Sequence, residues 1–233
     1  MIDNPITIGD ATLYLGDCME YMATLPDKAF ELAIVDPPYG IGANKMQLGN
    51  GKRTLFRGSL DWDSIPPSVE YFNELKRVSS NQIIWGANHF GNMEPSPCWI
   101  FWDKGTGSND FADGELAWTS FETTVRKYFQ SWVGANAKER NEVDRQHPTQ
   151  KPVKLYEWLL TNYAKPGDRI LDTHLGSCSS VIACLNMGYE ITGCELDPDY
   201  FAAGVERVQN SQRQETLFAP TQAKQDQLTL ETP

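Results

Sequence analysis

The tetrapeptide Asp36-Pro37-Pro38-Tyr39 is the part of the chain whose residue types point most directly to chemistry, and it follows the apolar run 32–35. Two prolines stiffen the segment, because each fixes its own φ and biases the preceding residue toward extended backbone. The Asp36 carboxylate and the Pro37 carbonyl could accept both hydrogens of a planar amino group, drawing its nitrogen toward tetrahedral geometry and freeing the lone pair to attack a methyl donor. Tyr39 would stack on the base that carries this amino group. The simpler alternative is a strand-ending turn, since Asp and Pro are common turn residues.

A second motif, at residues 172–180, combines a strand end, a glycine turn and a helix start. Gly176 would let backbone N–H groups approach a ligand closely at the helix N-terminus. Glu195 follows Asp172 by 23 residues at the end of another strand pattern, a spacing typical of the acid that binds ribose hydroxyls in dinucleotide-type folds. No Walker-type lysine follows the turn, which disfavours a triphosphate site. Helix capping is the simpler alternative for Asp172 and for the serines of the turn.

Alternating strand and helix patterns predict an α/β fold in one sizeable domain. The predicted strands lie near residues 11–16, 32–35, 82–86, 97–103, 169–172 and 190–195, and the predicted helices near 17–25, 69–78, 151–163, 178–187 and 198–208. Both motifs stand at strand ends, where open α/β sheets bind their ligands. We therefore expect the two motifs to face one another across the carboxyl edge of one sheet.

Two stretches depart from this alternation. Residues 109–146 are aromatic and charged, and we predict a small recognition insertion near 105–148. From Gln209 onward the chain is polar and rich in Gln and Thr, which predicts a flexible tail over 209–233. The segment 214–218 in this tail resembles peptides that dock on bacterial sliding clamps, so such a clamp is a candidate partner.

Charge argues against nucleic acid as a partner, because 20 Lys and Arg stand against 31 Asp and Glu and give a net charge of −11. Specific contacts need a basic patch more than a basic protein. One local basic stretch follows the first motif and supplies the predicted phosphate contacts Lys52, Arg53 and Arg57.

The five cysteines show no paired CxxC spacing and the three histidines are isolated, so we expect reduced thiols and no metal. No run of 18 apolar residues occurs, and the N-terminus lacks the pattern of a secretion signal. The sequence therefore predicts a cytoplasmic protein without a membrane segment.

Together, the two motifs closely resemble those of the β-group DNA amino-methyltransferases, which methylate adenine N6 or cytosine N4 using S-adenosylmethionine. In that family the catalytic motif precedes the cofactor motif, as Asp36 precedes Asp172 here. The resemblance implies a Rossmann-like methyltransferase fold with circularly permuted motif order, with residues 1–208 as the catalytic domain. It also implies methyl transfer to a base flipped from duplex DNA. Adenine is favoured because Asp, rather than Ser, leads the motif, and cytosine stays open.

The resemblance carries roles over to individual residues. The implied catalytic residues are Asp36, Pro37, Pro38 and Tyr39. Asp36 is also an implied cofactor contact. The other implied cofactor contacts are Asp17 and Cys18 at the adenine, Lys151 near the methionine carboxylate, Asp172, Gly176, Ser177 and Ser179 around the methionine and ribose, Glu195 on the ribose hydroxyls, and Leu196 on the adenine face.

Two residues depart from the family pattern. Cys178 stands at the second glycine position and adds a side chain where the backbone should approach the cofactor. His174 replaces a phenylalanine, and we interpret it as a structural histidine.

The alternatives left open are an RNA or protein-amide methyltransferase and a non-catalytic DNA-binding subunit. A homodimer and an accompanying restriction enzyme also stay open.

Overall fold

The computed structural model describes residues 4–42, 63, 65–106, 112–131 and 150–218. Within these ranges the chain forms one nine-stranded sheet of order β1-β2-β9-β8-β3-β4-β6-β5-β7. The strands are β1 (Ile6–Ile8), β2 (Ala11–Leu15), β3 (Phe30–Val35), β4 (Ser79–Trp85), β5 (Trp99–Asp103), β6 (Gly114–Thr119), β7 (Arg126–Phe129), β8 (Arg169–Asp172) and β9 (Glu190–Glu195). The helices are α1 (Cys18–Ala23), α2 (Val69–Val78), α3 (Val153–Tyr163), α4 (Ser179–Met187) and α5 (Pro198–Phe218), with a 3₁₀ turn η2 (Ala87–His89).

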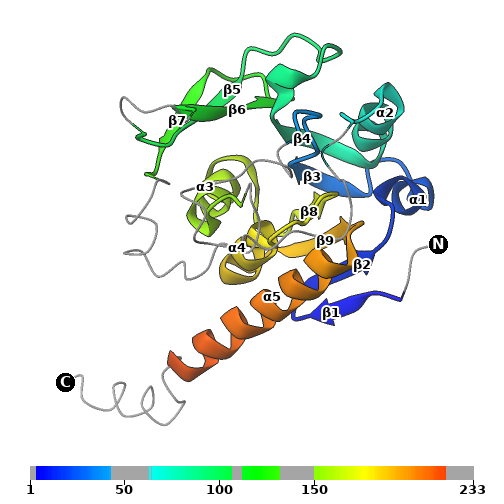
Figure 1. Cartoon of the computed structure of the whole chain (residues 1–233), viewed down its shortest axis with the longest axis vertical. Coiled ribbons are helices and arrows are strands. Elements are labelled where there is room, and N and C mark those ends of the chain that lie inside the picture. The colour runs from blue at the N-terminus through cyan, green and yellow to red at the C-terminus, as the bar shows by residue number, and fades with distance from the viewer. Residues whose placement is uncertain (1–3, 43–62, 64, 107–111, 132–149, 219–233) are drawn as a thin grey trace.

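Helices cover both faces of the sheet, α1 and α2 on one and α3, α4 and α5 on the other (Figure 1). Strand β3 shows why its apolar run is continuous. Leu32 and Ile34 pack in the core beneath α3–α5, whereas Ala33 and Val35 pack in the core beneath α1 and α2. Successive side chains of a strand point to opposite faces, so a strand covered on both sides is apolar throughout.

The order of the strands brings distant parts of the sequence together. Strands β8 and β9 come late in the chain but lie in the sheet between β2 and β3. All four run parallel, so their carboxyl ends meet at one edge of the sheet. This edge carries the first motif after β3 and the second motif after β8 and β9, as the sequence predicted.

The predicted insertion near 105–148 is wrong for the part of it that the structure describes. Residues 114–119 form β6, which lies between β4 and β5 in the sheet, and residues 126–129 form the edge strand β7. The pattern was missed because one half-buried position of β6 is Glu115, whose charge is neutralised by lysines and which breaks the apolar alternation. Residues 107–111 and 132–149 lie outside the described residues.

The predicted flexible tail is wrong for residues 209–218, which continue helix α5 to Phe218. Apolar contacts fade after Val208, but Gln, Arg and Glu favour helix and no glycine or proline interrupts it. The clamp-like segment 214–218 therefore forms the end of a helix, and clamp binding stays a prediction. Residues 219–233 lie outside the described residues. Among the helices that the structure describes, none is long and apolar enough to cross a membrane.

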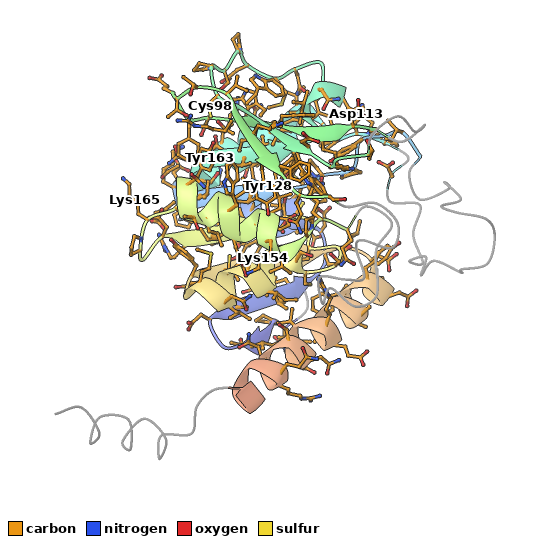
Figure 2. All side chains as sticks on the ribbon, turned by 90° about the vertical axis from the view of Figure 1, so that its left-hand side faces the viewer. Cys98, Asp113, Tyr128, Lys154, Tyr163 and Lys165 are labelled. Atoms are coloured by element: carbon orange, nitrogen blue, oxygen red, sulfur yellow. The ribbon has the colours of Figure 1, made fainter. Side chains whose placement is uncertain are left out.

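Helix α3 is tied to the far strands of the sheet by aromatic and hydroxyl contacts (Figure 2). The rings of Tyr128 on β7 and Trp158 on α3 lie 5.3 Å apart, and the Tyr163 hydroxyl lies 3.8 Å from Cys98 Sγ. These contacts fix the position of α3, which begins two residues after Lys151.

Candidate active site

The first motif forms a loop held at both ends. Asp36 directly follows β3, and its Oδ1 accepts a 2.6 Å hydrogen bond from the Tyr39 hydroxyl. Its Oδ2 accepts from the Lys151 ammonium. Beyond Tyr39, the Gly40 amide donates to Asp63 Oδ1 at 2.9 Å. The carboxylate that the sequence singled out is therefore fixed in orientation by two donors.

Tyr39 is packed closely against β4 and the turn that follows it. A Cβ added to Gly86 would lie 2.0 Å from Tyr39 Cε1, so only glycine leaves room for the ring. Gly86 also has a φ of +67°, which favours glycine. One face of the Tyr39 ring stacks on His89, with centroids 5.1 Å apart and an interplanar angle of 16°. Stacking of Tyr39 on a base stays a prediction, and His89 is a neighbour that the sequence did not indicate.

Lys151 lies between two protein carboxylates, Asp36 and Glu115. Its implied position near the methionine carboxylate of the cofactor stays a prediction. Its Nζ is 3.0 Å from Glu115 Oε2, and its side chain is 1 % exposed. The other Glu115 oxygen pairs with Lys104. Glu115 and Lys104 are members of the site that sequence reasoning missed.

The charges in this cluster stabilise one another. Burial alone would raise the pKa of Glu115, but the ammonium groups of Lys151 and Lys104 outweigh burial and lower that pKa to about 2. Burial alone would lower the pKa of Lys151, yet the two carboxylates raise it. Among the described residues Asp36 pairs with one lysine, Lys151, so burial dominates and the pKa of Asp36 is raised. Lys151 is thus a cation held between two acids of unequal strength.

The acids of the second motif brace their own turn. Asp172 is 2 % exposed, and its two oxygens accept from the His174 amide at 3.0 Å and the Ser180 hydroxyl at 2.5 Å. Glu195 accepts from the Gly176 amide at 2.8 Å and from the Asp197 amide at 2.9 Å. Within the part of the chain that the structure describes, helix α4 has no side-chain cap, so the capping alternative is not observed for Asp172. The bonds of Glu195 hold it beside the glycine turn.

The remaining predicted contacts lie at the ends of β2 and β9. Leu15 pairs with Glu195 across these strands, and the Gly16 amide donates to the Glu195 carbonyl at 2.9 Å. Asp17 is exposed and caps α1 through the Met19 amide at 2.8 Å. Cys18 is the first residue of α1, directly after Asp17. Leu196 directly follows Glu195 and is 57 % exposed. The chain thus presents a carboxylate and an apolar side chain together at the sheet edge.

Ser177 and Ser179 face helix α5. Their hydroxyls lie 3.2 Å apart, and Arg207 of α5 donates to the Ser179 hydroxyl at 2.9 Å and to the Ser177 carbonyl at 2.5 Å. Their predicted contact with a cofactor stays a prediction.

Cys178 stands where the resemblance implies a glycine, and the structure explains how the side chain is accommodated. Its φ is +57°, the left-handed region that favours glycine. Its side chain is 1 % exposed, and a Cβ on Gly204 of α5 would lie 2.5 Å from its Sγ. The thiol therefore points at α5, and Gly204 supplies the space for it.

We expect Gly204→Ala to destabilise the fold by about 1–3 kcal/mol, because overpacking outweighs the roughly 1 kcal/mol that alanine gains over glycine in a helix. The double variant Cys178→Gly/Gly204→Ala should be more stable than Gly204→Ala alone. Urea unfolding measures both, with Gly91→Ala as the control, since nothing lies within 4 Å of a Cβ there. Wild-type stability of Gly204→Ala would contradict the described packing.

Asp172 and His174 have pKa values shifted toward their neutral forms. Burial raises the pKa of Asp172 from 3.8 to about 7, with Asp36 and Glu195 adding to the shift. Burial lowers the pKa of His174 from 6.5 to about 4, and its Nδ1 lies 2.9 Å from the Thr173 hydroxyl. His174 is thus a neutral, hydrogen-bonded side chain at neutral pH, in line with the structural role predicted.

These shifts predict opposite effects of pH on stability. Between about pH 4 and 7, Asp172 keeps its proton in the folded state and loses it in the unfolded state. Rising pH therefore lowers the free energy of unfolding in this range, by up to about 4 kcal/mol for a three-unit shift. His174 acts in reverse, since unfolding takes up its proton between about pH 4 and 6.5. We expect Asp172→Asn to gain stability relative to wild type as pH rises from 4.5 to 6.5. Urea titrations at both pH values test this, with exposed Asp10→Asn as the control. The same change of stability with pH in wild type, Asp172→Asn and Asp10→Asn would contradict it.

The predicted phosphate contacts Lys52, Arg53 and Arg57 lie outside the described residues. Among the residues that the structure does describe, no group of three His, Cys, Asp or Glu side chains could hold a metal ion.

A family model described as DNA methylase matches residues 102–206, which include Lys151, Asp172 and Glu195. These residues are similar to the N6/N4 DNA methylases. Two proteins are similar to this chain over most of its length. YubD of Escherichia coli (strain K12) is 27 % identical over 85 % of this chain and 90 % of YubD, and the type II methyltransferase M.HinfI of Haemophilus influenzae is 26 % identical over 84 % of this chain and 68 % of M.HinfI.

Two solved structures share the fold of this chain. The M1.HpyAVI–SAM complex matches with a TM-score of 0.52 and 20 % identity over 84 % of this chain and 99 % of that one. The PvuII DNA methyltransferase, which is cytosine-N4-specific, matches with a TM-score of 0.53 and 16 % identity over 88 % and 92 %. At these identities the likeness concerns the fold.

Proposed function

We propose that the protein transfers a methyl group from S-adenosylmethionine to the N6 amino group of an adenine flipped out of duplex DNA. The observation that carries this proposal is the presence of Asp36, Asp172 and Glu195 at one sheet edge, with the pKa of Asp172 raised in part by the other two acids. An acceptor for an amino group thus stands beside a turn suited to a nucleoside cofactor.

Asp36 and the Pro37 carbonyl would accept the two hydrogens of the target amino group. Each carboxylate oxygen has two lone pairs, so the bonds from Tyr39 and Lys151 leave Asp36 able to accept another. Accepting these hydrogens localises the nitrogen lone pair for attack on a methyl carbon, and the nitrogen then loses one proton, first to Asp36 or water. The cofactor, when bound, supplies an electrophilic methyl group on a sulfonium.

The residues at the second motif fit such a cofactor. Glu195 offers a carboxylate for ribose hydroxyls, exposed Asp17 an acceptor for an adenine amino group, and exposed Leu196 an apolar surface for the ring. Because the Cys178 thiol points at α5, it leaves the turn backbone open to approach. That M1.HpyAVI was solved with SAM supports this assignment.

Cytosine N4 is the second candidate target. The leading Asp36 favours adenine, but the PvuII enzyme with the same fold is cytosine-N4-specific. Duplex DNA incubated with protein and S-adenosylmethionine, then digested and analysed by nucleoside mass spectrometry, separates the two. N6-methyladenine is expected, N4-methylcytosine would overturn the choice of base, and absence of methyl transfer to any duplex would overturn the function.

Three further parts of the proposal rest on the family resemblance. We infer that the motif order is circularly permuted, with the position of β8 and β9 between β2 and β3 in support. Lys52, Arg53 and Arg57 remain our candidates for phosphate contacts. A homodimer and a sliding-clamp partner are hypotheses with no support in the fold.

A further inference from the structure

Lys151 occupies a position that is unfavourable for a cation. Its side chain is 1 % exposed, and it stands two residues before α3, whose N-terminal end carries partial positive charge. A buried ammonium at such a place requires anions in contact with it. Asp36 and Glu115 are the two carboxylates that the described residues supply.

Glu115 is itself held from both sides. It lies on β6 opposite Trp102 of β5, and the next residue after β5, Lys104, pairs with its outer oxygen. Lys104 Nζ also lies 4.9 Å from the centre of the Trp102 ring. Glu115 therefore reaches Lys151 from a rigid sheet, whereas Asp36 reaches it from a loop.

The two carboxylates have different tasks under the proposed function, on which this inference rests. Asp36 must accept a hydrogen from the target amino group while it also pairs with Lys151, so its negative charge is shared between the two. If Asp36 were the single anion, binding of the target would leave the buried ammonium poorly compensated. A second carboxylate that never touches the substrate removes this conflict.

We propose that Glu115, anchored by Lys104, is a positioning residue for methyl transfer. It keeps the Lys151 ammonium in place while Asp36 shares its oxygens with the target amino group. Glu115 acts through Lys151 and contacts neither cofactor nor base. The charge of Glu115, rather than its volume, is the property that matters.

Glu115→Gln tests this, since it keeps the shape and removes the charge. Turnover at saturating donor and duplex is expected to fall about 10- to 100-fold, the range for losing one close contact between charged groups. The KM for DNA and the calorimetric dissociation constant for S-adenosylmethionine should change less than about threefold, because the ground-state contacts remain. Glu115→Asp keeps the charge and should recover part of the loss.

Glu122→Gln is the matched control, an exposed glutamate three residues beyond the end of β6, and it should behave as wild type. Wild-type turnover of Glu115→Gln overturns the proposal, and so does equal loss in Glu115→Asp and Glu115→Gln. If Glu115→Gln does not fold, Lys104→Gln decides: an approximately two- to fivefold loss is expected for a partly exposed pair, and unchanged turnover overturns the proposal. An inactive wild-type protein would instead overturn the proposed function.

Discussion

Replacing Asp36 with alanine is expected to lower turnover at saturating donor and duplex by about 10²- to 10³-fold, the effect of removing one preorganised polar contact from a closed site. The contact strengthens as the target nitrogen becomes tetrahedral, so its loss raises the barrier more than it weakens binding. Asp36→Asn, which keeps the shape of the side chain, should show most of the same loss. Calorimetry should find the affinity for S-adenosylmethionine little changed.

Glu195→Ala provides the contrast, because a ribose contact is the same in the ground state and the transition state. It should weaken cofactor binding and leave saturated turnover nearer to normal. Calorimetry and turnover at saturating donor and duplex, measured on both variants, separate chemistry from binding. Near-normal turnover of Asp36→Ala at saturation would require the amino-methyltransferase mechanism to be abandoned.

Replacing Lys151 with methionine is expected to destabilise the fold by about 3–5 kcal/mol, because removing one partner of a buried ion pair leaves uncompensated charge. Here two carboxylates, on Asp36 and Glu115, lose their shared cation. Urea unfolding gives the change in free energy. Adding Glu115→Gln to Lys151→Met should restore part of the loss, since it removes one of the stranded charges.

Lys154→Met is the matched control for this experiment. Lys154 lies three residues further along, is 69 % exposed and pairs with Glu157 on the surface of α3. Its loss should change the free energy of unfolding by less than about 1 kcal/mol, as for surface ion pairs in general. If both lysine variants lost equally little stability, Lys151 would not be a buried member of the site.

The sequence predicted the parts of the fold that local pattern determines. The helix over 69–78 agrees with α2, and the apolar runs before Asp36 and Asp172 are β3 and β8. The prediction that the two motifs share one sheet edge is confirmed because parallel strands align their carboxyl ends. These features depend on neighbours in the sequence.

Features that depend on contacts across the sheet could not be predicted in this way. Glu115 reads as an ordinary polar residue until β6 is placed beside β5 and Lys151 arrives from the start of α3. The direction of the Cys178 thiol is decided by Gly204, which lies on a helix formed later in the chain. The extent of α5 was underestimated because polar composition was interpreted as disorder.

The placement of β8 and β9 between β2 and β3 also governs how the chain can acquire its structure. Ala11 pairs with Ile191, and Leu32 with Ile170, so these partners lie far apart along the chain. Such high contact order slows folding, because large loops must close before their contacts form. During synthesis, the inner edges of β2 and β3 stay unpaired until β8 and β9 have left the ribosome, a period in which exposed strand edges favour aggregation. The topology that assembles the two motifs thus makes this a protein that folds late and as a unit.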